Sequence, residues 1–211
     1  MLHLPTEIIQ SWTRFYRGNF VNCLSGFKSA SLIGTINKEG DTNLAIFSNI
    51  VHLGADPALI GFINRPKEAA PHTIANIETT GWYTINHIHS EIIEQAHQTS
   101  AKYEEGDSEF SAVGLTPEWQ KDIPVPYVKE SLIKYALQLV EIVPIKHNNT
   151  FLIIGALKEA WIDDSVLDDD GFLSLERANS ITSLGVDGYY ETKRVARFAY
   201  AKPDVAPREI P

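Results

Sequence analysis

The sequence consists mainly of β-forming runs that follow one another along the chain, most of them separated by turns. SASLIGTI and NLAIFSNIV flank a turn that contains Gly40, and ALIGFIN and WYTINHI lie on either side of one short segment. YALQLVEIVPI and TFLIIGALKEAWI come later and are the longest runs. A doubly wound parallel sheet requires a helix between successive strands, so this order argues against it. We expect a closed antiparallel barrel of about seven strands with two or three added helices.

Helix signals occur in four places. Residues 5–20 carry apolar side chains on one side and form either a helix or an irregular arm. Pro71 favours a helix start and Gly81 a helix end, with isoleucines at helical spacing between them. Ser90 is expected to cap a helix through EIIEQAHQTSAKY, and Thr116 to begin another short helix. The stretch YEEGDSEF and the two tyrosines after Gly188 are expected in loops.

Length, charge and cysteine content limit the class of protein. The chain has 211 residues, which fits one domain over 1–211. Its net charge of -9 argues against nucleic acid or an anionic membrane as partner, because phosphate binding needs a concentrated basic surface. Cys23 is the single cysteine, so an intrachain disulfide is impossible and a cytoplasmic protein with a buried, inert thiol is expected. We expect no membrane span, since no apolar run is long enough.

Several common motifs are missing, and one metal motif is present in part. The chain has no G-x-G-x-x-G and no G-x-x-x-x-G-K-[ST], so a nucleotide is not bound through a glycine-rich turn. His87, His89 and Glu94 have the spacing of the first metal motif of cupins, and the two histidines would point to one face of a strand. Position 101 is Ala where that motif continues with Gly. A cupin-type metal protein is therefore the weaker alternative, and no metal ligand is assigned.

The segment from Ser25 to Asn86 resembles the flavin reductase-like family of FMN-binding split barrels. The features that match, in order, are Phe47-Ser48-Asn49, Ala55-Asp56-Pro57, Asn64-Arg65, His72-Thr73 with Asn76, and the run GWYTIN. Further along, TFLIIGAL and GVDGYYET resemble the family's late strand and its late Gly/Tyr loop. The resemblance implies a mainly β fold, a split antiparallel β-barrel with inserted and flanking helices, and an FMN site at the interface of a homodimer.

The residues of this segment suit a flavin with a phosphate tail. Arg65, His72 and Thr73 would supply a cation, a switchable donor and a hydroxyl, with Thr73 near a helix N-terminus that favours an anion. Asn64 precedes them in the matching motif. An apolar wall for the ring would come from Ile46 and Phe47, and its polar edge would face Ser48 and Asn49. Core packing for the first pair and a strand end for the second explain the pattern equally well.

The implied activity is electron transfer from NADH or NADPH through FMN to a flavin, an iron chelate or another acceptor. Hydride transfer asks little of acid–base side chains, so no catalytic residue is assigned. Tyr189 and Tyr190 would stack on a nicotinamide or a second flavin, unless they only pack within a loop. Ala156 stands where the family often has Glu. A flavin-binding carrier or sensor without turnover is therefore a second hypothesis.

Overall fold

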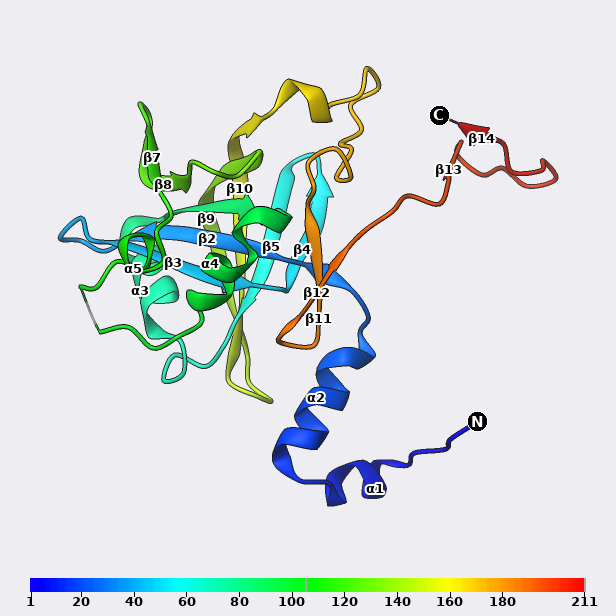
Figure 1. Ribbon diagram of the computed structural model, residues 1–211, viewed down its shortest axis with the longest axis horizontal. Coiled ribbons are helices and arrows are strands. Elements are labelled where there is room, and N and C mark those ends of the chain that lie inside the picture. Colours follow the sequence, from blue (N-terminus) through cyan, green and yellow to red (C-terminus); the bar gives the residue numbers. More distant parts are fainter. Residues whose placement is uncertain (105, 211) are drawn as a thin grey trace.

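Seven antiparallel strands form the main sheet of the computed structural model, which describes residues 1–104 and 106–210 (Figure 1). Their order across the sheet is β3-β2-β6-β9-β10-β5-β4. The strands are β2 (Ser31–Ile36), β3 (Thr42–Phe47), β4 (Ile50–Ala55), β5 (Ala58–Asn64), β6 (Trp82–His87), β9 (Ile133–Ile145) and β10 (Thr150–Ile162). These are the runs that the sequence predicts, except that NLAIFSNIV divides into β3 and the start of β4.

The sheet curls into a split barrel because its two edge strands are neighbours in the sequence. Only Ser48 and Asn49 connect β3 to β4, so the two edges meet at that point. In the sheet order of the described residues, β3 and β4 are not paired with each other, and the barrel stays open along this seam. Asn49 extends the β4–β5 pairing at the start of β4: its side-chain amide donates to the Ile63 carbonyl of β5 at 2.9 Å and accepts the Ile63 N–H at 3.3 Å. The predicted mainly β split barrel is confirmed.

Smaller elements surround the barrel. The helices are α1 (Thr6–Ser11), α2 (Arg14–Leu24), α3 (Pro71–Thr80), α4 (Ile93–Gln98) and α5 (Glu109–Val113), with 3-10 turns at Ser90–Ile92 and Asp164–Val166. A three-stranded sheet has the order β1-β11-β12, and two hairpins pair β7 with β8 and β13 with β14. Their bounds are β1 (Lys28–Ser29), β7 (Pro117–Gln120), β8 (Ile123–Val128), β11 (Ile181–Leu184), β12 (Gly188–Glu191), β13 (Arg197–Phe198) and β14 (Glu209–Ile210).

The helix α3 forms where the sequence predicts it and covers one end of the barrel core. Pro71 occupies its first turn, and Gly81 ends it in the left-handed conformation with φ of 72°. Ile74 and Ile77 are fully buried against Ile33 and Phe62 of the barrel. This packing fixes the start of α3 beside the point where β3 and β4 meet.

Four expectations about local structure are wrong. Thr116 does not begin a helix, because the next four residues pair with β8 as strand β7. Ser90 is not a helix cap: a 3-10 turn begins there, and α4 ends at Gln98. The tyrosines after Gly188 lie in strand β12, since β11 supplies a pairing partner that a short window of sequence does not reveal. Cys23 is exposed, because it lies on α2.

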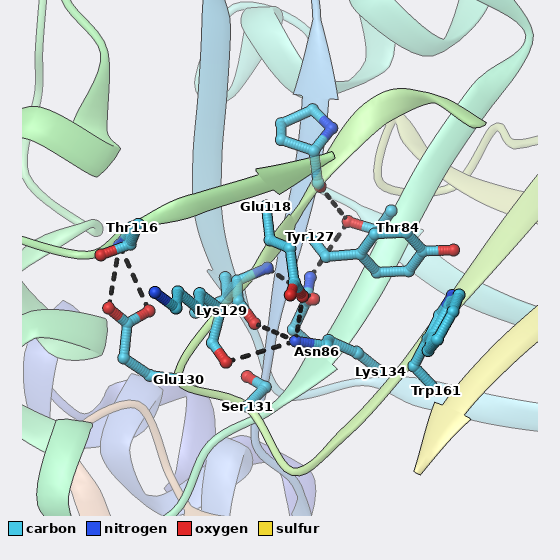
Figure 2. Close-up of polar contacts among 12 residues, drawn as sticks. Thr84, Asn86, Thr116, Glu118, Tyr127, Lys129, Glu130, Ser131, Lys134 and Trp161 are labelled. Atoms are coloured by element: carbon cyan, nitrogen blue, oxygen red, sulfur yellow. Dashed lines mark hydrogen bonds and ion pairs between the residues drawn. The ribbon is translucent and has the colours of Figure 1, made fainter. Parts of the chain in front are cut away.

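A polar cluster joins the β7–β8 hairpin to the barrel (Figure 2). The ammonium of Lys134 on β9 donates to the Glu118 carboxylate on β7 and to the carbonyl of Val128 at 3.2 Å. Asn86 on β6 accepts the N–H of Val128 at 2.9 Å. Lys134 is buried, so these acceptors replace the water that its charge loses on folding. These hydrogen bonds from β6 and β9 hold the β7–β8 hairpin against the barrel.

The N-terminal arm, formed by α1 and α2, leaves the barrel and projects away from it (Figure 1). Neither helix has a buried residue. Trp12 packs edge-on against Tyr16 and Phe20 within the arm. Within residues 1–104 and 106–210, no helix is long and apolar enough to cross a membrane.

Candidate functional site

A cleft of about 540 Å³ lies where the end of β3, the loop after β5 and the start of α3 converge. Segment 99–104 and the β11–β12 hairpin form its other side. Volumes of roughly 300–1,000 Å³ are typical of small-molecule sites. Eight of the ten residues that the sequence predicts for cofactor and substrate border this cleft: Ile46, Phe47, Ser48, Asn49, Arg65, His72, Thr73 and Tyr189. That these residues bind a cofactor stays a prediction.

The N-terminus of α3 faces the cleft without a side-chain cap. Its N-cap residue is Ala70, which has no oxygen to accept the first N–H groups of the helix. Ala70, Pro71, His72 and Thr73 all border the cleft, and Arg65 borders it from the preceding loop. Thr73 lies inside the first turn and does not cap the helix. This end of the cleft can hold an anion with backbone N–H groups, a hydroxyl and a guanidinium.

A buried polar network beneath the cleft holds Thr73 in place. The side-chain amide of Asn43 on β3 donates to the hydroxyls of Thr73 and Thr35, both at 3.3 Å. Asn76, one turn further along α3, donates to the Thr35 hydroxyl at 3.0 Å. Because the Thr73 oxygen accepts from Asn43, its own O–H remains available to an acceptor in the cleft.

The apolar part of the cleft lies at the end of β3. Ile46 and Phe47 border it, and the Phe47 ring packs edge-on against Phe62 in the barrel core, with ring centroids 4.9 Å apart. Both side chains are only partly buried. They therefore serve the core and the cleft wall at once, so the two explanations that the sequence left open do not exclude each other.

Two predicted site residues do not border the cleft. The side-chain amide of Asn64 donates to the carbonyls of Arg65 at 2.8 Å and Ala70 at 3.3 Å, so Asn64 shapes the loop that carries Arg65. Tyr190 packs against Phe27, with ring centroids 4.9 Å apart. Neighbouring residues of a strand point to opposite faces, which explains why Tyr189 reaches the cleft and Tyr190 does not.

Glu109, which is not among the residues predicted from the sequence, borders the cleft and is buried. Its carboxylate accepts the Leu44 N–H at 2.9 Å, joining α5 to β3. Burial raises the pKa of the Glu109 carboxyl above its usual range, while the bond from Leu44 and the nearby His72 act in the opposite direction. The expectation that YEEGDSEF is a loop is wrong for this residue, which begins helix α5. A short helix signal, Phe110 and Val113 followed by Gly114, could have placed Glu109 in a first turn.

The histidines of the cupin-like motif have separate environments. His87 lies beside the Tyr135 ring, and burial lowers the pKa of His87 to about 4. His89 makes a 3.0 Å hydrogen bond between its Nε2 and the Glu130 carbonyl. Across the described part of the chain, no group of three or more His, Cys, Asp and Glu side chains could hold a metal ion. The geometry thus gives no support to the metal-binding alternative.

Fold and cleft together define a class of protein: split antiparallel barrels with a ligand-sized cleft where the first hairpin meets the helix that follows. The model of the flavin reductase like domain matches residues 25–179. The chain therefore belongs to the flavin reductase like family.

Individual relatives agree with this placement. A Shewanella frigidimarina protein described as a candidate flavin reductase with a split barrel domain is 46% identical, with a TM-score of 0.92 over 95% of this chain and 100% of that chain. Nitrilotriacetate monooxygenase component B from Bacillus cereus has the same fold, with a TM-score of 0.81 and 21% identity over 92% of this chain and 96% of that one. An uncharacterized Aquifex aeolicus protein is 28% identical over 163 residues, 76% of this chain and 81% of its own length.

Proposed function

We propose that the chain is an FMN-dependent flavin reductase that passes electrons from NADH or NADPH to a flavin, an iron chelate or another acceptor. The observation that carries this proposal is the cleft itself. It brings together, from β3, the loop after β5 and α3, residues that the family resemblance selects for FMN. Membership of the flavin reductase like family supports the reaction class.

The donors present fit a flavin mononucleotide. The uncapped first turn of α3, the Thr73 hydroxyl and Arg65 would hold the phosphate, with His72 as a further donor. Ile46 and Phe47 would contact the flat ring, and Ser48 and Asn49 lie where the ring's polar edge would need donors and acceptors. Asn43 supports the phosphate end from below through its bond to Thr73.

A bound flavin supplies the hydride chemistry, and the protein orients the ring and sets its electrostatic surroundings. Arg65 and the N-terminus of α3 would favour negative charge at one end of the cleft. The buried Glu109 carboxyl disfavours further negative charge nearby when it is ionised. No side chain is required as an acid or base.

Anaerobic stopped-flow mixing of FMN-loaded protein with NADH, and separately with NADPH, tests the proposal. Loss of the oxidised flavin absorbance within seconds is the expected result. A flavin that stays oxidised with both nicotinamides would contradict a reductase and favour the carrier or sensor hypothesis. Ala156 does not bear on this choice: it lies on β10, pairs with Leu59 of β5 and does not border the cleft.

The N-terminal arm gives an independent reason to expect the homodimer that the family resemblance implies, because it exposes large apolar side chains. Phe15, Tyr16 and Leu24 are 83%, 63% and 64% exposed. Isolated helices as short as α1 and α2 are marginal in water unless an apolar face is covered. We expect a second copy of the chain to cover these side chains. Light scattering after gel filtration should give a dimer, and Phe15→Asp with Leu24→Asp should shift it toward monomer. A monomeric parent protein would contradict the proposal.

A further inference from the structure

The β11–β12 hairpin presents one chemically distinct face to the cleft. Ser183 and Tyr189 are directly opposite each other in the register, so their side chains share a face, and both border the cleft. Thr182 and Tyr190 form the next pair and point to the other face, where Tyr190 meets Phe27. The cleft therefore has a wall that carries an aromatic ring beside a hydroxyl.

The ring of this wall is held by a residue from another part of the chain. Nδ1 of His97, in the last turn of α4, lies 2.8 Å from the Tyr189 hydroxyl and shares a hydrogen bond with it. The two rings meet edge-on at 90°, with centroids 5.8 Å apart. His97 also borders the cleft. Tyr189 is partly buried against the core, and this hydrogen bond further restrains the orientation of its ring.

The hydroxyl of the wall lacks a partner. Ser183 is only 4% exposed, and its Oγ makes no hydrogen bond within the described residues. A buried hydroxyl without a partner is unfavourable, and at the edge of a ligand cleft the ligand can supply the missing bond. The Thr182 hydroxyl is also buried without a partner, but it lies on the face away from the cleft. It offers a matched control on the same strand.

We infer that Tyr189 and Ser183 form a second subsite of the cleft, which takes a planar heteroaromatic ring that carries a carbonyl or amide at its edge. The ring stacks on Tyr189, and its edge group hydrogen-bonds the Ser183 hydroxyl. His97 is a positioning residue that acts through Tyr189. Nicotinamides and flavins both have this chemistry, so the subsite would receive either the electron donor or a flavin acceptor. The inference rests on the proposed function, because it assumes that FMN occupies the other side of the cleft.

Calorimetric titration of the oxidised, FMN-loaded protein with NAD⁺ and, separately, with lumichrome tests the subsite without requiring turnover. Measurable binding of one of them is expected and identifies which ring the subsite takes. Tyr189→Ala should weaken that binding about tenfold or more, and Ser183→Ala by about three- to tenfold. His97→Leu should weaken it severalfold, while His97→Asn, whose amide can replace Nδ1, should restore most of the affinity. Thr182→Val and Tyr190→Phe should leave it unchanged.

Measuring FMN affinity in the same variants separates this inference from the proposed function. FMN binding that is retained in Ser183→Ala and Tyr189→Ala, together with lost ring binding, supports the subsite. Failure of both rings to bind a protein that holds FMN would overturn the subsite and leave the flavin site intact. Weakened FMN binding in Ser183→Ala would also overturn it, because this wall would then belong to the flavin. A protein that binds no FMN at all would refute the proposed function itself.

Discussion

The phosphate end of the cleft gives a quantitative prediction for the double substitution Arg65→Ala with Thr73→Ala. A charge-assisted hydrogen bond from Arg65 and a neutral one from Thr73 are together worth about 2–4 kcal/mol. Arg65 is exposed, so solvent screens its charge, whereas Thr73 is buried. We therefore expect the lower end of the range, about 2 kcal/mol, which corresponds to roughly thirtyfold weaker FMN binding.

The assay is a titration of FMN fluorescence quenching by the apo protein. Because Thr73 also accepts a bond from Asn43, circular dichroism and urea unfolding must show that the double variant is folded. Lys193→Ala with Arg194→Ala removes two exposed cations that do not border the cleft and should leave the affinity unchanged. Unchanged FMN affinity in Arg65→Ala with Thr73→Ala, or a large loss in the control, would refute the placement of the phosphate at α3.

Three further predictions concern stability. A Cβ at Gly155 would lie 2.2 Å from the Tyr83 hydroxyl, so Gly155→Ala should cost about 1–3 kcal/mol in urea unfolding, and less in a Tyr83→Phe background; equal costs would contradict the clash. The pKa of His87 is lowered from 6.5 to about 4 in the folded protein. Between these values the unfolded chain binds a proton that the folded chain does not, so the free energy of unfolding decreases as the pH is lowered. His87→Phe should remove up to about 3 kcal/mol of that loss by pH 4, whereas the exposed His147→Gln should not alter it. Glu118→Gln should cost about 2 kcal/mol by leaving the buried Lys134 ammonium without its carboxylate, and adding Lys134→Met should recover part of this; a fully additive loss would argue against the ion pair.

The sequence predicts those parts of the fold that depend on local signals. Pro71 and Gly81 delimit α3 because each residue has a backbone conformation that suits its position in the helix. The long β9–β10 hairpin can also be predicted from local signals, and Asn149 adopts the left-handed conformation at its turn. The three-stranded sheet could not be found in this way. Its strands β11 and β12 are four residues each, and β11 pairs with Lys28 and Ser29 far earlier in the chain.

The candidate site likewise contains some residues that local sequence motifs identify and others that only the tertiary packing brings to the cleft. The order of motifs from Phe47 to Thr73 selected residues that the structure gathers around one cleft. Which of Tyr189 and Tyr190 faces that cleft depends on the register of β12 with β11, and this register is fixed only by the folded sheet. Glu109 and His97 reach the cleft because α4 and α5 pack against the barrel, which no local pattern specifies.

A crystal structure of the protein grown with FMN, supported by the visible spectrum of the dissolved crystals, tests directly whether the cleft is a flavin site. We expect one FMN per chain, with its phosphate at the N-terminus of α3 beside Arg65 and Thr73 and its ring against Ile46 and Phe47. A colourless protein whose cleft holds no flavin at saturating FMN, or a flavin bound elsewhere on the barrel, would contradict this expectation.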